Sequence, residues 1–391
     1  MAGSEIILGI DFGTSYSTAA TVMNGKIYFA KDSRGESCVP SLVHFPKKGP
    51  PVVGFEAEKF RASDPQATVA GVKRLIGRGA DSSERRLFDQ ISPVRVKPGG
   101  VGEAILQVPG GDRSASDVGA LILQHLKAQA ESRFQQKVTK AVLTIPVKAG
   151  PAAHAAMVRC GKMAGLEILQ IVPEPCAGAI SQGRSSTDGM PLLVFDFGGG
   201  TFDSTVMRYE EKRMKVLSTG GDEVLGGDNF DQAFAKMVAG VIYKATQKDV
   251  TKDAVLWDRV ARTCETVKRA LSRGEESRYQ IPNAFLWAGQ DYSVNVNVTR
   301  RDLAPHWAEL VNRAVMCAAA TLVAADVTDA ELSRVLMIGG TSFIPQVQAA
   351  VKGQFKSSVV LEADPQTAVA RGAALVAAYP EILAAQESSA A

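Results

Sequence analysis

The stretch LLVFDFGGGTFDSTV, Leu192–Val206, decides the fold that we expect. An apolar run ends at Asp196, three glycines follow, and a second strand-like run begins after Thr201. A similar stretch, IILGIDFGTSYSTAATV, begins at Ile6 and carries its aspartate at Asp11. Each copy predicts a β-hairpin, because residues that favour strands flank a short turn containing glycine. One copy in each half of the chain predicts a duplicated architecture.

Both turns combine glycine with hydroxyl side chains, a combination that suits a phosphate ligand. Glycine lets the backbone approach a ligand closely, and successive N–H groups at a turn form a nest for an anion. An aspartate at the end of the strand can hold a hydrated Mg²⁺ through its water shell. A single DFG turn is more often an ordinary glycine turn. Two copies with matching hydroxyl groups favour hairpins that grip a triphosphate from both sides.

Composition limits the class of protein. The chain has 391 residues and a formal net charge of +3, which predicts two or more lobes and indicates no basic surface for nucleic acid. The N-terminus lacks a basic region and reaches Glu5 too early for a signal peptide. The longest apolar run, VMCAAATLVAA from Val315, is too short to span a bilayer. We therefore expect neither a nucleic acid nor a membrane as a partner.

Cysteine usage and missing motifs exclude other classes. The five cysteines form no CxxC pair, so we expect reduced core thiols in a cytoplasmic protein. No GxxxxGKS/T phosphate loop and no HExxH zinc motif occurs, and the HRDxxxxN loop of protein kinases is absent although DFG occurs twice.

Strand and helix patterns alternate in both halves. Apolar residues recur at helical spacing over 114–134, 152–166 and 226–245, with Asp228 or Asn229 as the expected cap of the last helix. KAVLTIPV and EILQIVPEP between them are strand-like. RVLMIGGTSFIPQVQAAVKGQF, 334–355, predicts a strand, a Gly-Gly turn at a helix N-terminus where anions bind well, and a helix. Such alternation predicts the α/β class.

Six short motifs occur in one order: VKRLIGR (Val72–Arg78), EPCAGAI (Glu174–Ile180), FDFGGGTFD (Phe195–Asp203), LGGDNFD (Leu225–Asp231), CETVKRALS (Cys264–Ser272) and GGTSFIP (Gly339–Pro345). With these motifs the chain resembles, over nearly its whole length, the nucleotide-binding domain of the seventy-kilodalton heat-shock chaperones of the DnaK type. The resemblance implies the duplicated actin-like ATPase fold, in which two ribonuclease H-like lobes surround a nucleotide cleft. It argues against actins and sugar kinases as close relatives.

The resemblance and the repeat together predict domain boundaries. Lobe I is expected over 1–184, with a C-terminal helix, 364–383, returning to it. Lobe II is expected over 185–363 and includes a subdomain over 225–305. Residues 384–391 are expected to form a flexible tail, and closure of the cleft is the expected conformational output.

The resemblance also implies the site residues, carried over by position. The first phosphate loop would comprise Asp11, Gly13, Thr14, Ser15 and Tyr16, and the second Asp196, Gly198, Gly199, Gly200, Thr201 and Asp203, with Gly227 as a further backbone contact. The adenosine would meet Glu265, Lys268, Arg269, Ser272, Gly339, Gly340, Thr341, Phe343 and Gln366. The catalytic group would comprise Lys73, Asp11, Glu174, Asp196, Thr201 and Asp203, and Asp11 and Asp196 would hold Mg²⁺ with ATP or ADP; K⁺ is left open as a second cation.

The implied reaction is slow hydrolysis of ATP to ADP and phosphate, for which the protein mainly positions and neutralises charge. An aspartate with an ordinary pKa of about 3.9 is a weak base at neutral pH, so the three aspartates are expected to order water. Periodicity alone gives a plainer interpretation of the helix over 258–272. Val260, Cys264, Val267 and Leu271 form an apolar stripe, and the charged residues beside it form an ordinary ladder of ion pairs.

Several positions depart from the family pattern. Phe343 stands where the family usually has an arginine, and Gln366 where it has an aspartate. IPVKAG, 145–150, replaces the family's PAYF and brings in Lys148, while His154 replaces an arginine and Pro173 an asparagine. These changes would alter nucleotide affinity or ADP release, with binding retained.

Only 11 residues follow Pro380, so the family's linker and substrate-binding domain are not in the sequence given. Two explanations stay open: the chain is trimmed from a longer protein, or the natural protein consists of the two lobes alone. We expect a chaperone motor with a J-domain co-chaperone, a nucleotide-exchange factor and a substrate-binding domain located elsewhere as partners. The alternative is an ATP-regulated interaction module with little turnover and no client-peptide binding.

Overall fold

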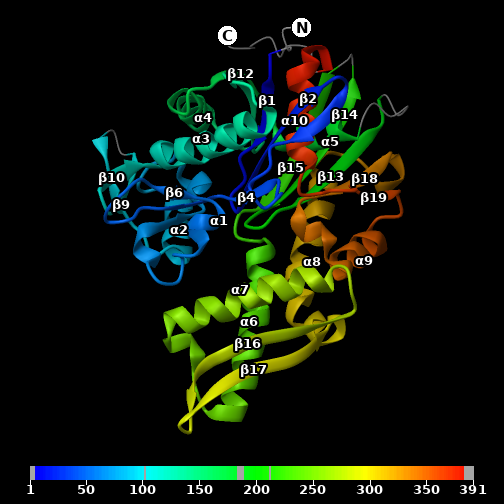
Figure 1. Cartoon of the computed structure of the whole chain (residues 1–391). Helices are drawn as coiled ribbons and strands as arrows, with labels where there is room; N and C mark the ends of the chain where they lie inside the picture. Colours follow the sequence, from blue (N-terminus) through cyan, green and yellow to red (C-terminus); the bar gives the residue numbers. More distant parts are fainter. Residues whose placement is uncertain (1–4, 101–102, 183–188, 211–212, 383–391) are drawn as a thin grey trace.

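The computed structural model describes residues 5–100, 103–182, 189–210 and 213–382 (Figure 1). Two mixed sheets lie in the upper part of the molecule, one from each half of the chain, and an arm of helices and one long hairpin extends below them. The described cysteines, including the buried Cys160, Cys176 and Cys264, are free thiols.

The first sheet has the order β12-β11-β1-β2-β3, with β4 pairing on β2. Strand β1 runs antiparallel to β2 and parallel to β11, which pairs in parallel with β12. The strands are β1 (Ile7–Asp11), β2 (Tyr16–Met23), β3 (Lys26–Phe29), β4 (Cys38–Pro40), β11 (Lys140–Ile145) and β12 (Glu167–Pro173).

The second sheet repeats this topology in the order β15-β14-β13-β18-β19. Strand β13 runs antiparallel to β14 and parallel to β18, as β1 does to β2 and β11. The register also repeats, because Asp11 lies opposite Thr18 in one hairpin and Asp196 opposite Asp203 in the other. The strands are β13 (Pro191–Phe197), β14 (Phe202–Glu210), β15 (Arg213–Asp222), β18 (Arg334–Ile338) and β19 (Val359–Leu361). The duplicated actin-like α/β fold is thereby confirmed.

Helices cover both sheets. On the first sheet, α3 (Ala115–Phe134) packs against α4 (Pro151–Met163), and α10 (Ala368–Ala378) packs on β1, β2 and α5 (Glu174–Ser181). Glycines permit the close approach of α10, because a Cβ on Gly9 would lie 2.0 Å from the Ala374 nitrogen and one on Gly372 would lie 1.8 Å from the Ala177 oxygen.

Two small sheets extend the first half. One contains β5 (Leu42–His44), β6 (Val52–Val53) and β7 (Thr68–Ala70), and the other β8 (Arg95–Pro98), β9 (Ala104–Val108) and β10 (Gly111–Ser114). The short helices α1 (Phe55–Glu58) and α2 (Ser83–Ile91) pack against these sheets, and a 3₁₀ turn, η2 (Val72–Leu75), carries Lys73 toward the centre of the molecule.

The arm is built from α6 (Gly227–Thr246), α7 (Ala254–Leu271) and the hairpin β16 (Glu276–Trp287) and β17 (Gln290–Thr299) (Figure 1). Helix α8 (Arg300–Ala324) connects the arm to the second sheet, and α9 (Pro345–Gln354) packs beside α8. By length and composition α8 could cross a membrane, a point that the eleven-residue run from Val315 did not reveal. In the structure one face of α8 packs into the core, and its buried Trp307 donates a hydrogen bond of 3.0 Å to the Phe230 carbonyl oxygen.

Two local predictions are wrong at the starts of helices. Helix α6 is capped at Gly226, whose N–H donates to Asn229 Oδ1 at 2.8 Å, so neither Asp228 nor Asn229 is the cap. Gly339 caps a 3₁₀ turn, η6 (Gly340–Phe343), and α9 begins only at Pro345. Glycine therefore caps α6 where Asp or Asn was expected, whereas at 339–340 the glycines begin a 3₁₀ turn and not the helix.

The other predicted helices and strands are found close to their expected positions. Helix α3 begins after Ser114, which forms a capping box with Asp117. Helix α10 lies within the predicted 364–383, whereas the predicted tail, 384–391, falls outside the described residues. The numerical lobe boundaries stay predictions.

Candidate functional site

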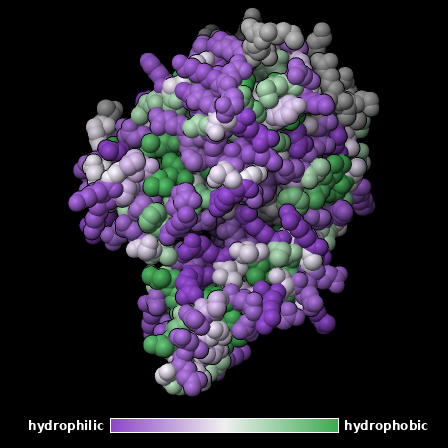
Figure 2. Space-filling view, viewed as in Figure 1, coloured by the Kyte–Doolittle hydropathy of each residue, from purple (hydrophilic) through white to green (hydrophobic). Residues whose placement is uncertain are grey.

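A cavity of about 720 Å³ lies between the two sheets and the arm. In the space-filling view, the recess at the centre of this face is lined by hydrophilic residues (Figure 2). Every candidate site residue from the sequence lines this cavity: Asp11, Gly13, Thr14, Ser15, Tyr16, Lys73, Glu174, Asp196, Gly198, Gly199, Gly200, Thr201, Asp203, Gly227, Glu265, Lys268, Arg269, Ser272, Gly339, Gly340, Thr341, Phe343 and Gln366. The structure therefore brings together residues spread over more than 350 positions of the chain.

The first glycine turn joins β1 to β2 and is fixed by Ser41. The Ser41 hydroxyl donates to the Gly13 carbonyl oxygen at 2.8 Å, and the Ser41 N–H donates to the Ser15 carbonyl oxygen at 2.9 Å. A Cβ on Gly13 would lie 1.9 Å from the Tyr16 carbonyl oxygen. The turn therefore requires glycine for its own close backbone contact.

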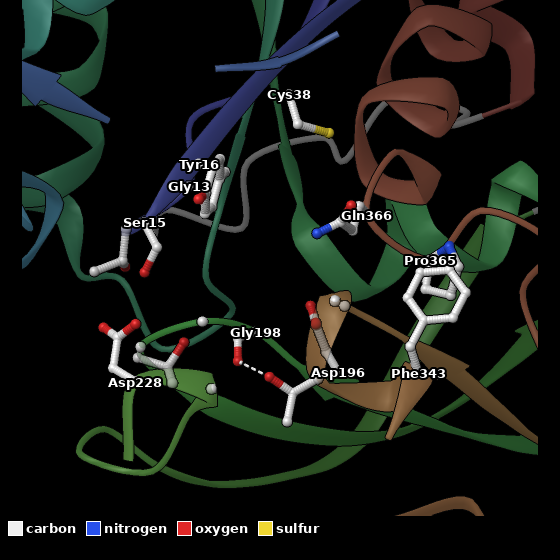
Figure 3. A pocket seen from close by; sticks show the side chains of 18 of the residues that line it. Gly13, Ser15, Tyr16, Cys38, Asp196, Gly198, Asp228, Phe343, Pro365 and Gln366 are labelled. Atoms are coloured by element: carbon white, nitrogen blue, oxygen red, sulfur yellow. Dashed lines mark hydrogen bonds between the residues drawn. The ribbon is translucent and has the colours of Figure 1, made fainter. Parts of the chain in front are cut away.

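The second turn joins β13 to β14 and is held by its carbonyl oxygens. The Gly198 carbonyl accepts hydrogen bonds from Thr341 Oγ1 at 2.7 Å and from the Gly227 N–H at 3.1 Å, and the first of these appears in Figure 3. The Gly199 carbonyl accepts from the Asp228 N–H at 2.8 Å. The start of α6 thus supports the turn from below.

The two turns meet across the cavity. A Cβ on Gly199 would lie 2.7 Å from Ser15 Oγ, and a Cβ on Gly200 would lie 3.2 Å from Thr14 Cγ2. Arg74 strengthens this contact, because its Nη2 donates to the Gly200 carbonyl oxygen at 2.7 Å. Two backbone turns this close to each other, one from each half, form a binding site for a small polyanion.

Buried carboxylates surround a single ammonium group below the turns. Lys73 Nζ lies 2.5 Å from Glu174 Oε1, and both side chains are largely buried. Burial lowers the pKa of Lys73, but the neighbouring Glu174 and Asp11 carboxylates outweigh this effect and the pKa is raised. Lys73 is therefore positively charged at neutral pH.

The carboxylates are not fully neutralised by Lys73. Burial, together with the Glu174 carboxylate, raises the pKa of Asp11 to about 7 and that of Asp203 to about 6. Burial and the same neighbour also raise the pKa of Asp196 well above its usual value. A group of acids crowded in this way favours an additional cation, which would stabilise the ionised forms.

Helix α7 supplies the lower wall of the cavity. As the periodicity indicated, Val260, Cys264, Val267 and Leu271 are buried in the core. On the neighbouring face Lys268 Nζ contacts Asp231 Oδ2 at 2.5 Å, and Arg269 Nη2 contacts Glu265 Oε1 at 2.7 Å.

Tyr16 points to this helix. Its hydroxyl donates to Glu265 Oε1 at 2.9 Å, and the Arg269 guanidinium lies 4.9 Å from the centre of its ring. Burial raises the pKa of Glu265, but Arg269 and Lys268 outweigh it and hold that pKa below its usual value. The ionised Glu265 thus accepts a hydrogen bond from Tyr16, a residue that the sequence assigned only to the first phosphate loop.

Phe343 and Gln366 mark another part of the cavity. Phe343 and Pro365 both line this part, and in Figure 3 the Gln366 amide nitrogen points into the cavity. Gly339 has φ of 81°, and a Cβ there would lie 2.4 Å from the Phe197 carbonyl oxygen. The glycine therefore allows η6 to pack directly against the end of β13.

Comparison with known proteins now identifies the family. The family model described as "Hsp70 protein" matches residues 7–388. This chain belongs to the Hsp70 family. A mitochondrial 70-kDa heat shock protein of Solanum tuberosum is 32% identical over 374 residues, which are 96% of this chain and 54% of that relative. The chain thus spans about half the length of that Hsp70 and corresponds to the nucleotide-binding region.

Sequence reasoning missed some lining residues of this Hsp70 site. Asp228 and Asp231 line the cavity and stand inside the LGGDNFD motif, where their spacing on one helical face could have revealed them. Cys38 and Pro365 also line it, and no sequence pattern indicates them. His154 and Pro173 are not among the lining residues.

Proposed function

We propose that this chain binds ATP with Mg²⁺ in the cavity, hydrolyses it slowly to ADP and phosphate, and closes its two halves according to the bound nucleotide. Members of the Hsp70 family are ATPases. The observation that carries the proposal for this chain is the apposition of Ser15 and Gly199, which lie in the two glycine turns. The β- and γ-phosphates would lie between these turns, and the nucleoside would lie against α7.

Lys73 and the carboxylates would perform complementary roles. Charge spreads over the γ-phosphoryl oxygens in the transition state, so a fixed ammonium group at Lys73 would stabilise it. Glu174, held by Lys73, would orient the attacking water. The Thr201 hydroxyl would donate a hydrogen bond to the γ-phosphate or to that water. Asp203 would order water from the opposite strand of the second hairpin.

The residues present fit a hydrated Mg²⁺ ion. No group of three or more His, Cys, Asp or Glu side chains is spaced to hold a metal ion among the residues that the structure describes. The buried carboxylates of Asp11 and Asp196, with their raised pKa values, instead suit an ion held mainly by phosphate and water. When bound, Mg²⁺ would neutralise charge on the phosphates.

Single-turnover hydrolysis of radiolabelled ATP tests the function. Wild-type protein is expected to cleave bound ATP slowly, whereas Lys73→Ala is expected to bind ATP and cleave it at least about 100-fold more slowly. Lys162→Ala, at an exposed lysine of α4, is the matched control and should behave as wild type. Equal rates in wild type and Lys73→Ala would favour the alternative function, an ATP-regulated interaction module with little turnover.

The family membership suggests partners that can be tested in the same assay. A J-domain protein is expected to accelerate hydrolysis, and a nucleotide-exchange factor is expected to accelerate ADP release. We also propose that the chain works with a substrate-binding domain located elsewhere. A cytoplasmic location is part of the same proposal.

A further inference from the structure

A second, much smaller cavity lies behind the carboxylates. Its volume is about 10 Å³, which is room for about one water molecule. Glu174, Asp196 and Asp203 line both this cavity and the large one, so they form a shared wall between the two. The far side is formed by Lys148 and Pro146, which follow β11, and by Thr219 and Gly220 of β15.

Lys148 supplies the positive charge on the far side of the small cavity. It is exposed, and it forms no ion pair or hydrogen bond within the described part of the chain, so its ammonium group is not committed elsewhere. Its charge nevertheless acts on Asp203, whose pKa it lowers together with Lys73 against the effects of burial and Glu174. We call the carboxyl groups of Glu174, Asp196 and Asp203 the carboxylate wall. This wall lies between Lys73 and Lys148, which come from different loops of the first half.

The charge balance explains why a second lysine matters. Lys73 faces Asp11, Glu174, Asp196 and Asp203, which is four carboxylates for one ammonium group. Like charges in a site of low dielectric repel strongly, which contributes to the raised pKa values of these aspartates, and a further positive charge on their other side favours the ionised form of Asp203. Position 148 has departed from the family's PAYF motif, so this charge belongs to this chain.

We propose that Lys148 is a positioning residue for ATP hydrolysis, which supplies a second positive charge behind the carboxylate wall and holds Asp203 and Glu174 in the arrangement that orders the attacking water. The inference rests on the proposed function. In the step concerned, the water oxygen forms a bond to the γ-phosphorus, the bond from that phosphorus to the β–γ bridging oxygen breaks, and the proton of the water passes to solvent. Lys148 touches neither the water nor the phosphate and acts through the two carboxylates.

The test compares Lys148→Met, Lys148→Arg and Lys162→Met with wild type in two separate measurements, ATP affinity and the single-turnover rate. Lys148→Met is expected to lower the rate about tenfold, equivalent to about 1.4 kcal/mol, and to leave the affinity within about twofold. Lys148→Arg should keep the rate within about twofold of wild type, because it keeps the charge. Lys162→Met, which removes a comparably exposed charge on α4, should change neither quantity.

Chemical rescue separates the charge from a merely structural role. In Lys148→Ala, millimolar methylammonium is expected to restore part of the lost rate in proportion to its concentration, whereas the bulky tetraethylammonium ion is not. The inference is overturned if Lys148→Met hydrolyses ATP as fast as wild type, or if its rate falls but methylammonium restores nothing in Lys148→Ala. Absence of hydrolysis in wild type would instead overturn the proposed function itself, and the two failures are therefore distinguishable.

Discussion

The hydroxyl of Tyr16 donates a 2.9 Å hydrogen bond to Glu265, a residue 249 positions further along the chain. Tyr16 begins β2 in the first half, and Glu265 lies in the middle of α7 in the arm. Because both residues line the cavity, this bond joins the two halves at the site. Two residues expected to contact the nucleotide, Tyr16 at the phosphates and Glu265 at the adenosine, thus also help to hold the halves together.

Two further contacts extend this connection along α7. Arg262 Nη1 donates to the Glu58 carbonyl oxygen at 3.1 Å, and Asp258 Oδ1 lies 3.8 Å from the Arg61 guanidinium. Asp258, Arg262 and Glu265 are spaced four and three residues apart, so they share one face of the helix. That face is in contact with the first half at its outer end and with the cavity at its inner end.

Replacing Tyr16 by phenylalanine should loosen this connection. The change Tyr16→Phe removes only the hydroxyl, and a hydrogen bond to a charged group contributes about 1.5–3 kcal/mol. We expect the dissociation rate constant of a fluorescent ADP analogue to rise about tenfold, measured by stopped-flow displacement. Tyr28→Phe, on β3 away from the cavity, serves as the control. Equal dissociation rates in Tyr16→Phe and wild type would show that the bond does not hold the cleft closed.

A methyl group at Gly199 should force the two glycine turns apart. In Gly199→Ala the new Cβ would lie 2.7 Å from Ser15 Oγ and 2.9 Å from Ser15 Cβ, closer than real Cβ atoms approach. We expect ATP affinity to fall at least about tenfold, or about 1.4 kcal/mol, with little change in thermal stability. The measurement is calorimetric titration together with a thermal melt.

Gly240→Ala is the matched control for that substitution. Nothing lies within 4 Å of a Cβ at Gly240, in the middle of α6, and alanine is favoured over glycine in a helix by about 1 kcal/mol. This variant should bind ATP as wild type does and melt at a slightly higher temperature. If Gly199→Ala bound ATP as tightly as Gly240→Ala, the contact between the turns would be irrelevant to the ligand.

Phe343 should contribute to binding of the base and not of the phosphates. Stacking of a base on an aromatic ring contributes about 1–3 kcal/mol, so Phe343→Ala is expected to weaken ATP binding about tenfold. Binding of inorganic tripolyphosphate, measured by competition, should stay unchanged because it has no base. Equal losses for the two ligands would indicate that Phe343 supports the fold of the cavity instead.

Removal of Mg²⁺ should weaken the binding of ATP far more than that of adenosine. Without the metal, the negatively charged triphosphate would lie close to four carboxyl groups, and Lys73 would be the ammonium group beside them that offsets the repulsion. The four carboxyl groups are those of Asp11, Glu174, Asp196 and Asp203. We expect the affinity for ATP to fall by more than about tenfold in EDTA, and the affinity for adenosine to stay within about twofold. The idea fails if ATP binds equally well with and without the metal.

The sequence predicted the elements whose signals are local. The hairpins around Asp11 and Asp196 were predicted because strand-forming residues flank glycine turns, and the buried stripe of α7 was predicted from its spacing. The candidate site residues were carried over from the family resemblance by position, and the structure gathers them in one cavity. Their roles stay predictions.

Tertiary contacts were not predicted, because they depend on how distant segments meet. Nothing near Tyr16 indicates that its hydroxyl reaches Glu265, and nothing near Ser41 indicates that it fixes the first turn. The cap of α6 at Gly226 was missed for a similar reason. A Cβ there would lie 2.3 Å from the Gly199 carbonyl oxygen, so the second turn requires glycine where sequence preference favours Asp or Asn.

Calorimetric titration of the wild-type chain with Mg-ATP tests the central claim most directly. The account predicts saturable binding of one nucleotide per chain, abolished in a Gly199→Ala, Lys268→Ala double variant that alters both the turns and α7. A wild-type chain that showed no binding at millimolar Mg-ATP would contradict it.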